Sequence, residues 1–272
     1  MRLNGKIILK GLGLHSGKEC KLKIEPCESQ EILMCSGNNE LPLSKFKFNG
    51  TNRGSDYIFD DGTRIRTCEH VLSALTGMGI WSGVRISVDG GEMPALDGCA
   101  KLLSDELMKS AVKSEDKENE AIEISQPVIV HNDDRKRFVA AFPADKLHIT
   151  YMVEYDFIGA QVFDYDHSPE SYYENIASAR TFAMLSDIEY LRAHGMALGG
   201  SLDNAIVVGE KIQASGGLRW ENEFVRHKVL DIIGDLAALG QPLKAHVIAL
   251  RAGHELHLKL VEKLREQSLK GE

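Results

Sequence analysis

A strongly charged segment at residues 109–120, KSAVKSEDKENE, separates two parts of the chain that show the same order of expected elements. In the first part, strand-rich sequence leads to a helix beginning near Cys68, then to the alternating strand VRISV and a helix in CAKLLSDELMK. In the second, strand-rich sequence leads to a helix at about 223–239, then to the strand HVIAL and the helix GHELHLKLVEKLREQ. This order predicts two related α+β domains, each a sheet with helices on one face.

The predicted domains span residues 1–112 and 121–272, with a charged linker at 113–120. A chain of 272 residues is long enough for two domains of ordinary size and can bury a core without covalent cross-links. Residue identity between the two parts is slight, so the expected repeat concerns architecture only.

Composition narrows the class of protein. The five Cys, at positions 20, 27, 35, 68 and 99, include no Cys-x-x-Cys pair, which indicates reduced thiols rather than disulfides or a thiolate zinc site. The formal charge of −8 disfavours nucleic acid as a partner. No stretch approaches the ~18 apolar residues of a transmembrane segment, and the apolar run at the start is too short for a signal peptide. We therefore expect a cytoplasmic protein.

The glycine-rich string GLGLHSGK near the N-terminus resembles a nucleotide-binding loop but has the wrong spacing. Its G-x-G-x-x-x-G is one residue longer than the dinucleotide fingerprint, and Leu12 and Glu19 stand where a Walker loop needs Gly and Ser or Thr. Short expected strands flank it at Ile7–Leu9 and Cys20–Ile24, and the second alternates apolar with charged residues. The string is therefore interpreted as a hairpin turn that exposes His15.

The expected helix at 223–239 carries a stripe of metal-binding residue types. His227, Asp231 and Asp235 follow at i, i+4 and i+8, which places them in one narrow line along the helix. An imidazole and a carboxylate one turn apart can bind a divalent ion such as zinc, and the second Asp can orient a neighbouring group. The alternative is a solvated polar face opposite the apolar face of the helix.

The helix beginning near Cys68 offers further candidates. Thr67 is the expected N-cap, and Glu69 and His70 follow in the first turn, about 100° apart. His70 would supply a second imidazole, and Glu69 would act as general base for a metal-bound water. Glu69 could instead only complement the positive end of the helix.

Near the C-terminus, His254 follows the strand HVIAL after the three residues Arg-Ala-Gly, a place where catalytic residues often lie. It is a candidate acid catalyst. With His257 it also forms an H-x-x-H pair that could hold a metal, an alternative that we rank below the first. Ser201, in GGSLDN, lacks the spacing of a nucleophile elbow.

Six strings, in this order, closely resemble the zinc-dependent UDP-3-O-acyl-N-acetylglucosamine deacetylases of bacterial lipid A synthesis: TCEHVLSALTGMG, DGGEMPALDGCA, ARTF, GGSLDNAIVV, EFVRHKVLDIIGDLAALG and AGHELHLKL. The resemblance covers nearly the whole chain. It implies two α+β domains packed face to face as a sandwich, with the active site between them.

The resemblance also implies roles for individual residues. His70, His227 and Asp231 would be the zinc ligands, Glu69 the general base and His254 the general acid. Iron(II) can occupy a similar nitrogen–oxygen site. Of the ten His, only His70, His227 and His254 are expected to take part in metal binding or catalysis.

Further roles follow from the same resemblance. Asp235 would orient the acid catalyst, Thr181 would help to stabilise the oxyanion, and Phe182 and Lys228 would lie near the sugar nucleotide. An insertion at about 183–213 would form a passage for the acyl chain. The substrate would be an acylated UDP-sugar, UDP-3-O-(3-hydroxyacyl)-N-acetylglucosamine, which a monomeric enzyme would hydrolyse to acetate and the free amine.

This chain departs from the family at several positions. Ala183 and Met184 follow ARTF where the family often has Gly and an aromatic residue, and Glu255, His257 and Leu258 replace the common Ala, Asn and Asn. The residues expected for metal binding and acid–base chemistry are all present. Two other hypotheses are a non-catalytic sugar-nucleotide binder and an amidohydrolase for another N-acetylated substrate.

Overall fold

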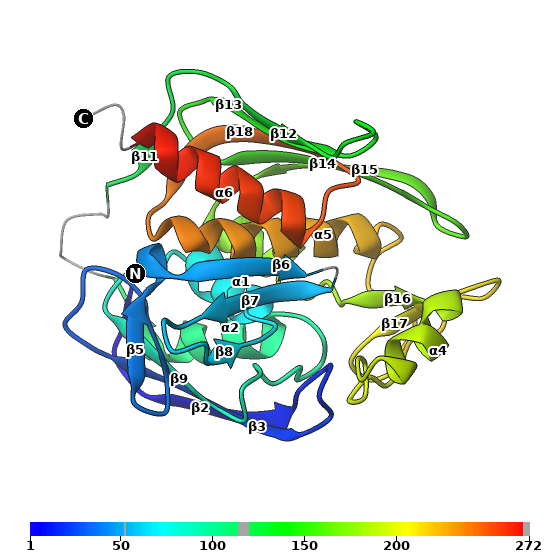
Figure 1. Cartoon of the computed structure of the whole chain (residues 1–272), viewed down its shortest axis with the longest axis horizontal. Coiled ribbons are helices and arrows are strands. Elements are labelled where there is room, and N and C mark those ends of the chain that lie inside the picture. Colours follow the sequence, from blue (N-terminus) through cyan, green and yellow to red (C-terminus); the bar gives the residue numbers. More distant parts are fainter. Residues whose placement is uncertain (52, 114–119, 269–272) are drawn as a thin grey trace.

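Two five-strand paths with the same topology form the framework of the computed structural model, which describes residues 1–51, 53–113 and 120–268 (Figure 1). The first half contains β1 Arg2–Leu3, β2 Ile7–Leu12, β3 Glu19–Pro26, β4 Leu33–Ser36, β5 Asn39–Pro42, β6 Lys47–Thr51, β7 Gly54–Ile58, β8 Arg64–Ile65, α1 Glu69–Gly77, β9 Val84–Asp89, α2 Lys101–Ser110 and β10 Ala111–Val112. The second contains β11 Ile122–Glu123, β12 Val128–His131, β13 Phe138–Pro143, β14 His148–Tyr155, β15 Gly159–Asp166, α3 Pro169–Asn175, β16 Phe182–Met184, α4 Leu185–Ala193, β17 Ile206–Val208, α5 Glu223–Leu236, β18 Leu243–Leu250 and α6 His254–Ser268.

The strand order is β2-β3-β9-β4-β5 in one sheet and β12-β13-β18-β14-β15 in the other, where β11 also pairs with β18. In each sheet, the last of the five strands enters the middle, antiparallel to one neighbour and parallel to the other. Each of these central strands lies between two helices in the chain, α1 and α2 or α5 and α6. The predicted pair of related α+β units is therefore confirmed.

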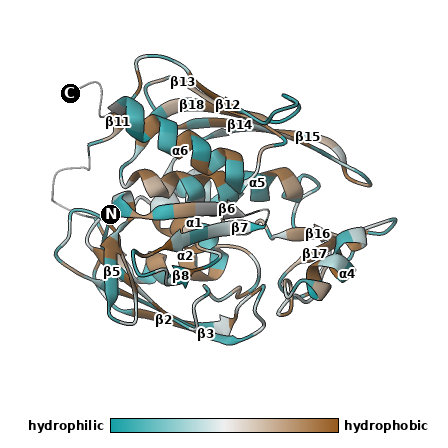
Figure 2. Ribbon diagram, in the orientation of Figure 1, coloured by the Kyte–Doolittle hydropathy of each residue, from teal (hydrophilic) through white to brown (hydrophobic). Residues whose placement is uncertain are grey.

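The helices α1, α2, α5 and α6 lie between the two sheets, so the layers run from sheet to helices to helices to sheet, whereas α4 lies at the side with β16 and β17 (Figure 1). Figure 2 shows hydrophilic and hydrophobic residues alternating along α6, as expected for a helix with one side in solvent. By contrast, α5 is buried on nearly all sides, its polar residues included. The stripe predicted on this helix is thus not a solvated face.

A glycine lets the two central helices touch. A Cβ placed on Gly234 of α5 would lie 2.0 Å from the backbone oxygen of Glu69, the first residue of α1. Any larger residue would push the helices apart. This contact sets the start of α1 directly against the middle of α5.

The predicted N-cap of α1 is wrong. The cap position belongs to Cys68, whose side chain makes no capping bond, and Thr67 has a left-handed backbone with φ of 56°. The Thr67 hydroxyl donates instead to the buried carboxylate of Glu92, 3.2 Å away. The Thr67 hydroxyl therefore bonds to a residue distant in sequence instead of capping α1.

The predicted hairpin is confirmed, because β2 and β3 pair antiparallel around the glycine-rich string. His15 is half-buried rather than exposed. Its backbone oxygen accepts a hydrogen bond from the Leu198 amide at 3.1 Å, and its Nδ1 accepts one from the Ala197 amide at 3.3 Å. The turn therefore holds the segment that follows α4.

The charged segment is only partly described. Residues 109–110 end α2 and residues 111–112 form β10, which pairs with β1, so the first four residues of the segment belong to the first half. The predicted linker at 113–120 falls mostly on residues 114–119, which lie outside the described residues. The domain boundaries remain a prediction.

All five cysteines are free thiols, as expected, and only Cys27 is not fully buried. Within the described ranges, no helix combines the length and the apolar character needed to cross a membrane.

Candidate metal centre and active site

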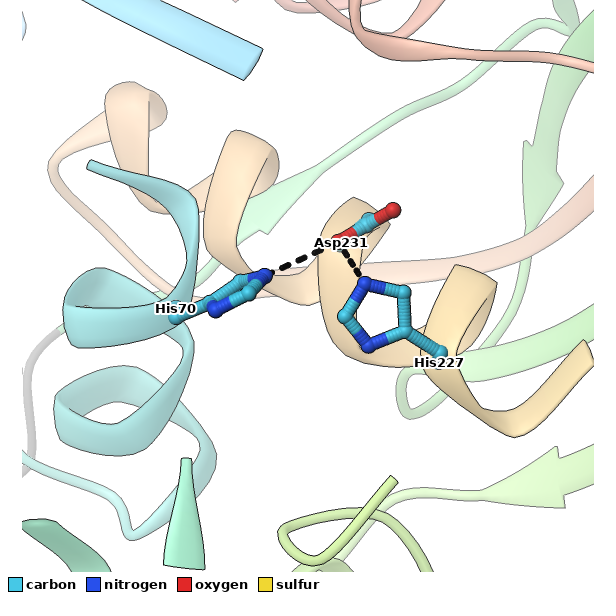
Figure 3. Close-up of side chains that lie close together, drawn as sticks. All are labelled: His70, His227 and Asp231. Atoms are coloured by element: carbon cyan, nitrogen blue, oxygen red, sulfur yellow. Dashed lines mark ion pairs between the residues drawn. The ribbon is translucent and has the colours of Figure 1, made fainter. Parts of the chain in front are cut away.

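His70 from α1 and the pair His227 and Asp231 from α5 converge between the two halves of the chain (Figure 3). Their ligand atoms all lie within 4.8 Å of one another. Oδ1 of Asp231 is 3.2 Å from Nε2 of His227 and 3.7 Å from Nε2 of His70. The contact between α1 and α5 thus brings together three side chains that are far apart in the sequence.

The His227 ring is held in one tautomer. Its Nδ1 lies 3.0 Å from the carbonyl oxygen of Ala179, which can only accept, so Nδ1 carries the proton. Burial lowers the pKa of His227 to about 3, and the imidazole is therefore neutral. Its Nε2 lone pair is directed at Asp231, as a metal ligand requires.

The two carboxylate oxygens of Asp231 differ in their hydrogen bonds. Oδ2 accepts a hydrogen bond from Nζ of Lys228 at 2.6 Å, whereas Oδ1 is buried without a hydrogen-bond partner among the described residues. Burial alone would raise the pKa of this carboxyl, but His227 and Lys228 hold it well below its usual range. A buried carboxylate oxygen facing two imidazole nitrogens is a donor set that fits zinc.

A buried ion pair positions the strand next to this centre. The guanidinium of Arg180 donates to both carboxylate oxygens of Glu223, at 2.9 Å from Nε and 3.1 Å from Nη2, and both side chains are almost fully buried. This pair ties the segment before β16 to the start of α5. It thereby fixes the carbonyl of Ala179 and places Thr181 at the site. This Arg is part of the ARTF string, but no spacing in the sequence indicates its buried partner.

Glu69 lies beside the metal-binding group and is 3% exposed. Its Oε2 accepts a hydrogen bond from the backbone amide of Ser55 at 2.9 Å, so β7 fixes the carboxylate. Its Oε1 is 4.0 Å from Nε2 of His254. The two residues expected to act as base and acid therefore face each other.

His254 is the first residue of α6 and contacts two carboxylates besides Glu69. Its Nδ1 is 2.8 Å from Oδ2 of Asp235, and its Nε2 is 3.8 Å from Oδ2 of Asp231. Burial alone would lower the pKa of His254, but the carboxylates of Asp235, Glu69 and Asp231 raise it to about 9. The ring is therefore an imidazolium at neutral pH, able to donate a proton.

Asp235 supports His254 from behind. Its Oδ1 accepts a hydrogen bond from the Ser55 hydroxyl, and its Oδ2 accepts from His254. Although burial would raise the pKa of Asp235, His254 and His257 lower it to about 2. The carboxylate stays ionised and acts only as an acceptor.

His257 is a site residue that sequence reasoning missed. It is fully buried, and its Nδ1 lies 2.7 Å from Oδ2 of Asp235, the oxygen that His254 also contacts. Its Nε2 lies 3.0 Å from the Tyr151 hydroxyl. The H-x-x-H pattern was the available signal, but the contact of both histidines with one carboxylate depends on how α6 packs on α5.

These residues border a cavity of about 380 Å³ between the two halves. Eight of the nine predicted site residues line it, and Asp235 lies behind them. The ε-ammonium of Lys228, which bonds to Asp231, is also 5.5 Å from the ring centroid of Phe182. The lining also includes three cations that sequence reasoning did not identify: Arg53, Arg137 and Arg251.

A second cavity of about 190 Å³ shares Thr181, Phe182 and Ala183 with the first and extends under α4. Ile188 and Leu191, both in the expected insertion, line this cavity, whereas Met184 lines the larger one.

The chain is similar to known proteins along its length. The family model for UDP-3-O-acyl N-acetylglycosamine deacetylase matches residues 1–266. A relative from Syntrophus aciditrophicus, named UDP-3-O-acyl-N-acetylglucosamine deacetylase, is 37% identical over 272 residues, covering 97% of this chain and 85% of the relative. A protein of the same name from Thermodesulfovibrio yellowstonii is 34% identical, and the match covers 97% of this chain and 91% of the relative. Another, from Oleidesulfovibrio alaskensis, is 37% identical, and the match covers 91% of this chain and 82% of the relative. Together these matches show that the chain belongs to the UDP-3-O-acyl N-acetylglycosamine deacetylase family.

Proposed function

We propose that this protein is a zinc-dependent deacetylase that removes the N-acetyl group of UDP-3-O-(3-hydroxyacyl)-N-acetylglucosamine, an early step of lipid A synthesis in the cytoplasm, and that it acts as a monomer. One observation carries the proposal. A buried oxygen of Asp231 faces the imidazoles of His70 and His227, beside a carboxylate and an imidazolium that face each other across the same cavity. The names of the relatives support an acylated UDP-sugar, UDP-3-O-acyl-N-acetylglucosamine, as the class of substrate.

His70, His227 and Asp231 would hold the metal. Zinc bound by three protein ligands keeps a coordination position open, where it lowers the pKa of water and polarises a carbonyl group. Iron(II) suits the same donors. His227 needs no deprotonation to bind, because its pKa is about 3.

Glu69 takes the proton of the attacking water. The Ser55 amide occupies one of its carboxylate oxygens, which leaves Oε1 directed at the cavity. As the amide carbonyl becomes tetrahedral, the Thr181 hydroxyl donates a hydrogen bond to its oxygen. His254 then protonates the glucosamine nitrogen as the carbon–nitrogen bond breaks, and acetate and the free amine leave.

The substrate is an anion, and the cavity supplies local cations despite the net charge of −8. Phe182 and Lys228 would contact the sugar nucleotide, and Arg137 and Arg251 line the same cavity, where Arg251 pairs with Glu154 at 3.5 Å. The smaller, adjoining cavity under α4 would receive the acyl chain, with Ile188 and Leu191 in its wall.

Acetate release from the acylated UDP-sugar, compared with unacylated UDP-N-acetylglucosamine, tests the reaction and the substrate together. We expect rapid release from the first and slow release from the second. Equal rates would support an amidohydrolase of broader substrate range, and tight binding without release would support a non-catalytic binder.

Metal analysis tests the ligands. Asp231→Ala should lose the catalytic zinc and its activity, whereas Asp133→Ala, at an exposed position, should retain both. Full zinc occupancy of the catalytic centre in Asp231→Ala would contradict the ligand assignment.

A further inference from the structure

A second group of metal-ligating side chains lies on the outer face of the second sheet, away from the helices. His148 on β14 pairs in register with His246 on β18, and Thr150 on β14 pairs with Asp164 on β15. The residues next to them in the strands, such as Ile149 and Val247, are fully buried against the core. Because side chains alternate across a strand, the two histidines and Asp164 share the opposite, solvent-facing side.

The three side chains are close enough to bind one ion. Their ligand atoms all lie within 4.8 Å of one another. Nε2 of His148 is 2.8 Å from Oδ1 of Asp164, and the rings of His148 and His246 are 4.5 Å apart between centroids, at 84° to each other. Two imidazoles and a carboxylate are donors that zinc and related divalent ions accept.

The surroundings orient these donors as they do in known metal sites. Nδ1 of His148 lies 2.8 Å from Oδ1 of Asp166, which fixes the ring and leaves Nε2 to face the group. The Thr150 hydroxyl donates a hydrogen bond to Oδ1 of Asp164, with Oγ1 at 2.6 Å from this oxygen. The same Oγ1 lies 2.9 Å from Nε2 of His246. A carboxylate behind a ligating imidazole, with the ligating carboxylate itself hydrogen-bonded, is the usual outer arrangement of such sites.

We propose that His148, His246 and Asp164 form a second zinc site, with Asp166 orienting His148, and that solvent completes the coordination. An ion there would join β14, β15 and β18. It would brace the β14–β15 hairpin, whose Glu154 and Tyr155 line the large cavity. The site shares no residue with the centre between α1 and α5, so it does not depend on the proposed function.

The stoichiometry of bound zinc tests this proposal. Purified, metal-free protein is equilibrated with zinc at pH 7.5, separated from free ion by gel filtration, and analysed by mass spectrometry of the metal. We expect two ions in the native protein, one in a His148→Ala/His246→Ala variant, one in Asp231→Ala, and none when all three substitutions are combined. His131→Ala, an exposed histidine of the same sheet, is the matched control and should retain two.

Two outcomes would overturn the proposal. One is a single ion in both the native protein and the His148→Ala/His246→Ala variant. In that case His148 only forms hydrogen bonds with Asp164 and Asp166 and binds no metal. The other is a second ion that persists in this variant but is lost with Asp231→Ala, which would place both ions in the large cavity. The melting temperature and the acetate release of the double variant are measured with zinc bound at the catalytic centre alone. Near-native values would exclude misfolding as the cause of a lower number of bound zinc ions.

Discussion

His254 and His257 donate hydrogen bonds to the same carboxylate oxygen, with their Nδ1 atoms 2.8 and 2.7 Å from Oδ2 of Asp235. The pKa values of the two rings move in opposite directions. Burial lowers the pKa of His257, whereas the carboxylates around His254 raise its pKa to about 9 against the effect of burial. One carboxylate thus supports a charged imidazole that faces the cavity and a neutral one that packs in the core.

His254→Ala is expected to reduce turnover by ~100-fold or more, since a positioned acid–base catalyst contributes at least this much. The zinc content should not change, because His254 is not among the three proposed ligands. Steady-state kinetics and metal analysis of the same preparation check both statements. Native-like turnover in this variant would contradict the assignment of His254 as the acid.

The pH profile should depend on Asp235. His254 acts in its protonated form, so turnover should fall as the pH rises through the pKa of His254. Asp235→Asn removes the carboxylate that raises the pKa of His254 most, and the alkaline limb should therefore move to lower pH. Profiles of kcat/KM for the two proteins provide the measurement. An alkaline limb at the same pH in both would exclude His254 as the group that titrates there.

His257→Ala is expected to destabilise the protein by about 2 kcal/mol or more, because it leaves a buried carboxylate oxygen and the Tyr151 hydroxyl each without one partner. Urea unfolding measures the loss. His257→Asn, which keeps a side-chain donor, should recover part of it. His131→Ala, at the surface, should change stability by less than about 0.5 kcal/mol. Equal midpoints for His257→Ala and His131→Ala would show that the buried contact contributes nothing.

Gly234→Ala should lower stability by about 3 kcal/mol or more, since the new methyl group would overlap the backbone of Glu69. Zinc affinity should fall as well, because the same contact sets His70 against α5. Gly5→Ala is the control, as a Cβ there would meet only Ser110 at 3.9 Å. A Gly234→Ala protein with native stability and native zinc affinity would mean that the two helices can separate without cost.

The sequence predicts the parts of the site that are local and misses those that are tertiary. The spacing of His227, Asp231 and Asp235 places them on one line of a helix, and the family resemblance relates them to His70 and Glu69. No spacing indicates that this line is buried, because the burial comes from α1 packing at Gly234.

Other contacts were unpredictable for the same reason. The Ser55 amide binds Glu69 of α1, and the Ser55 hydroxyl binds Asp235 of α5, which lies 180 residues further along the chain. Thr67 has the residue type of an N-cap, yet Glu92 captures its hydroxyl. The pattern of elements alone predicted two related α+β units, but not the strand order within each sheet.

The origin of the proposed ligands in both halves of the chain has a consequence for biosynthesis. Of the three ligands proposed for the centre between α1 and α5, a growing polypeptide that has not yet reached residue 227 offers only His70, and a lone imidazole binds zinc weakly. Metal capture must therefore wait until α5 has been made and has docked on α1. Hydrolytic competence comes later still, because His254 is made after α5, and a chain that stops before it lacks the proposed acid.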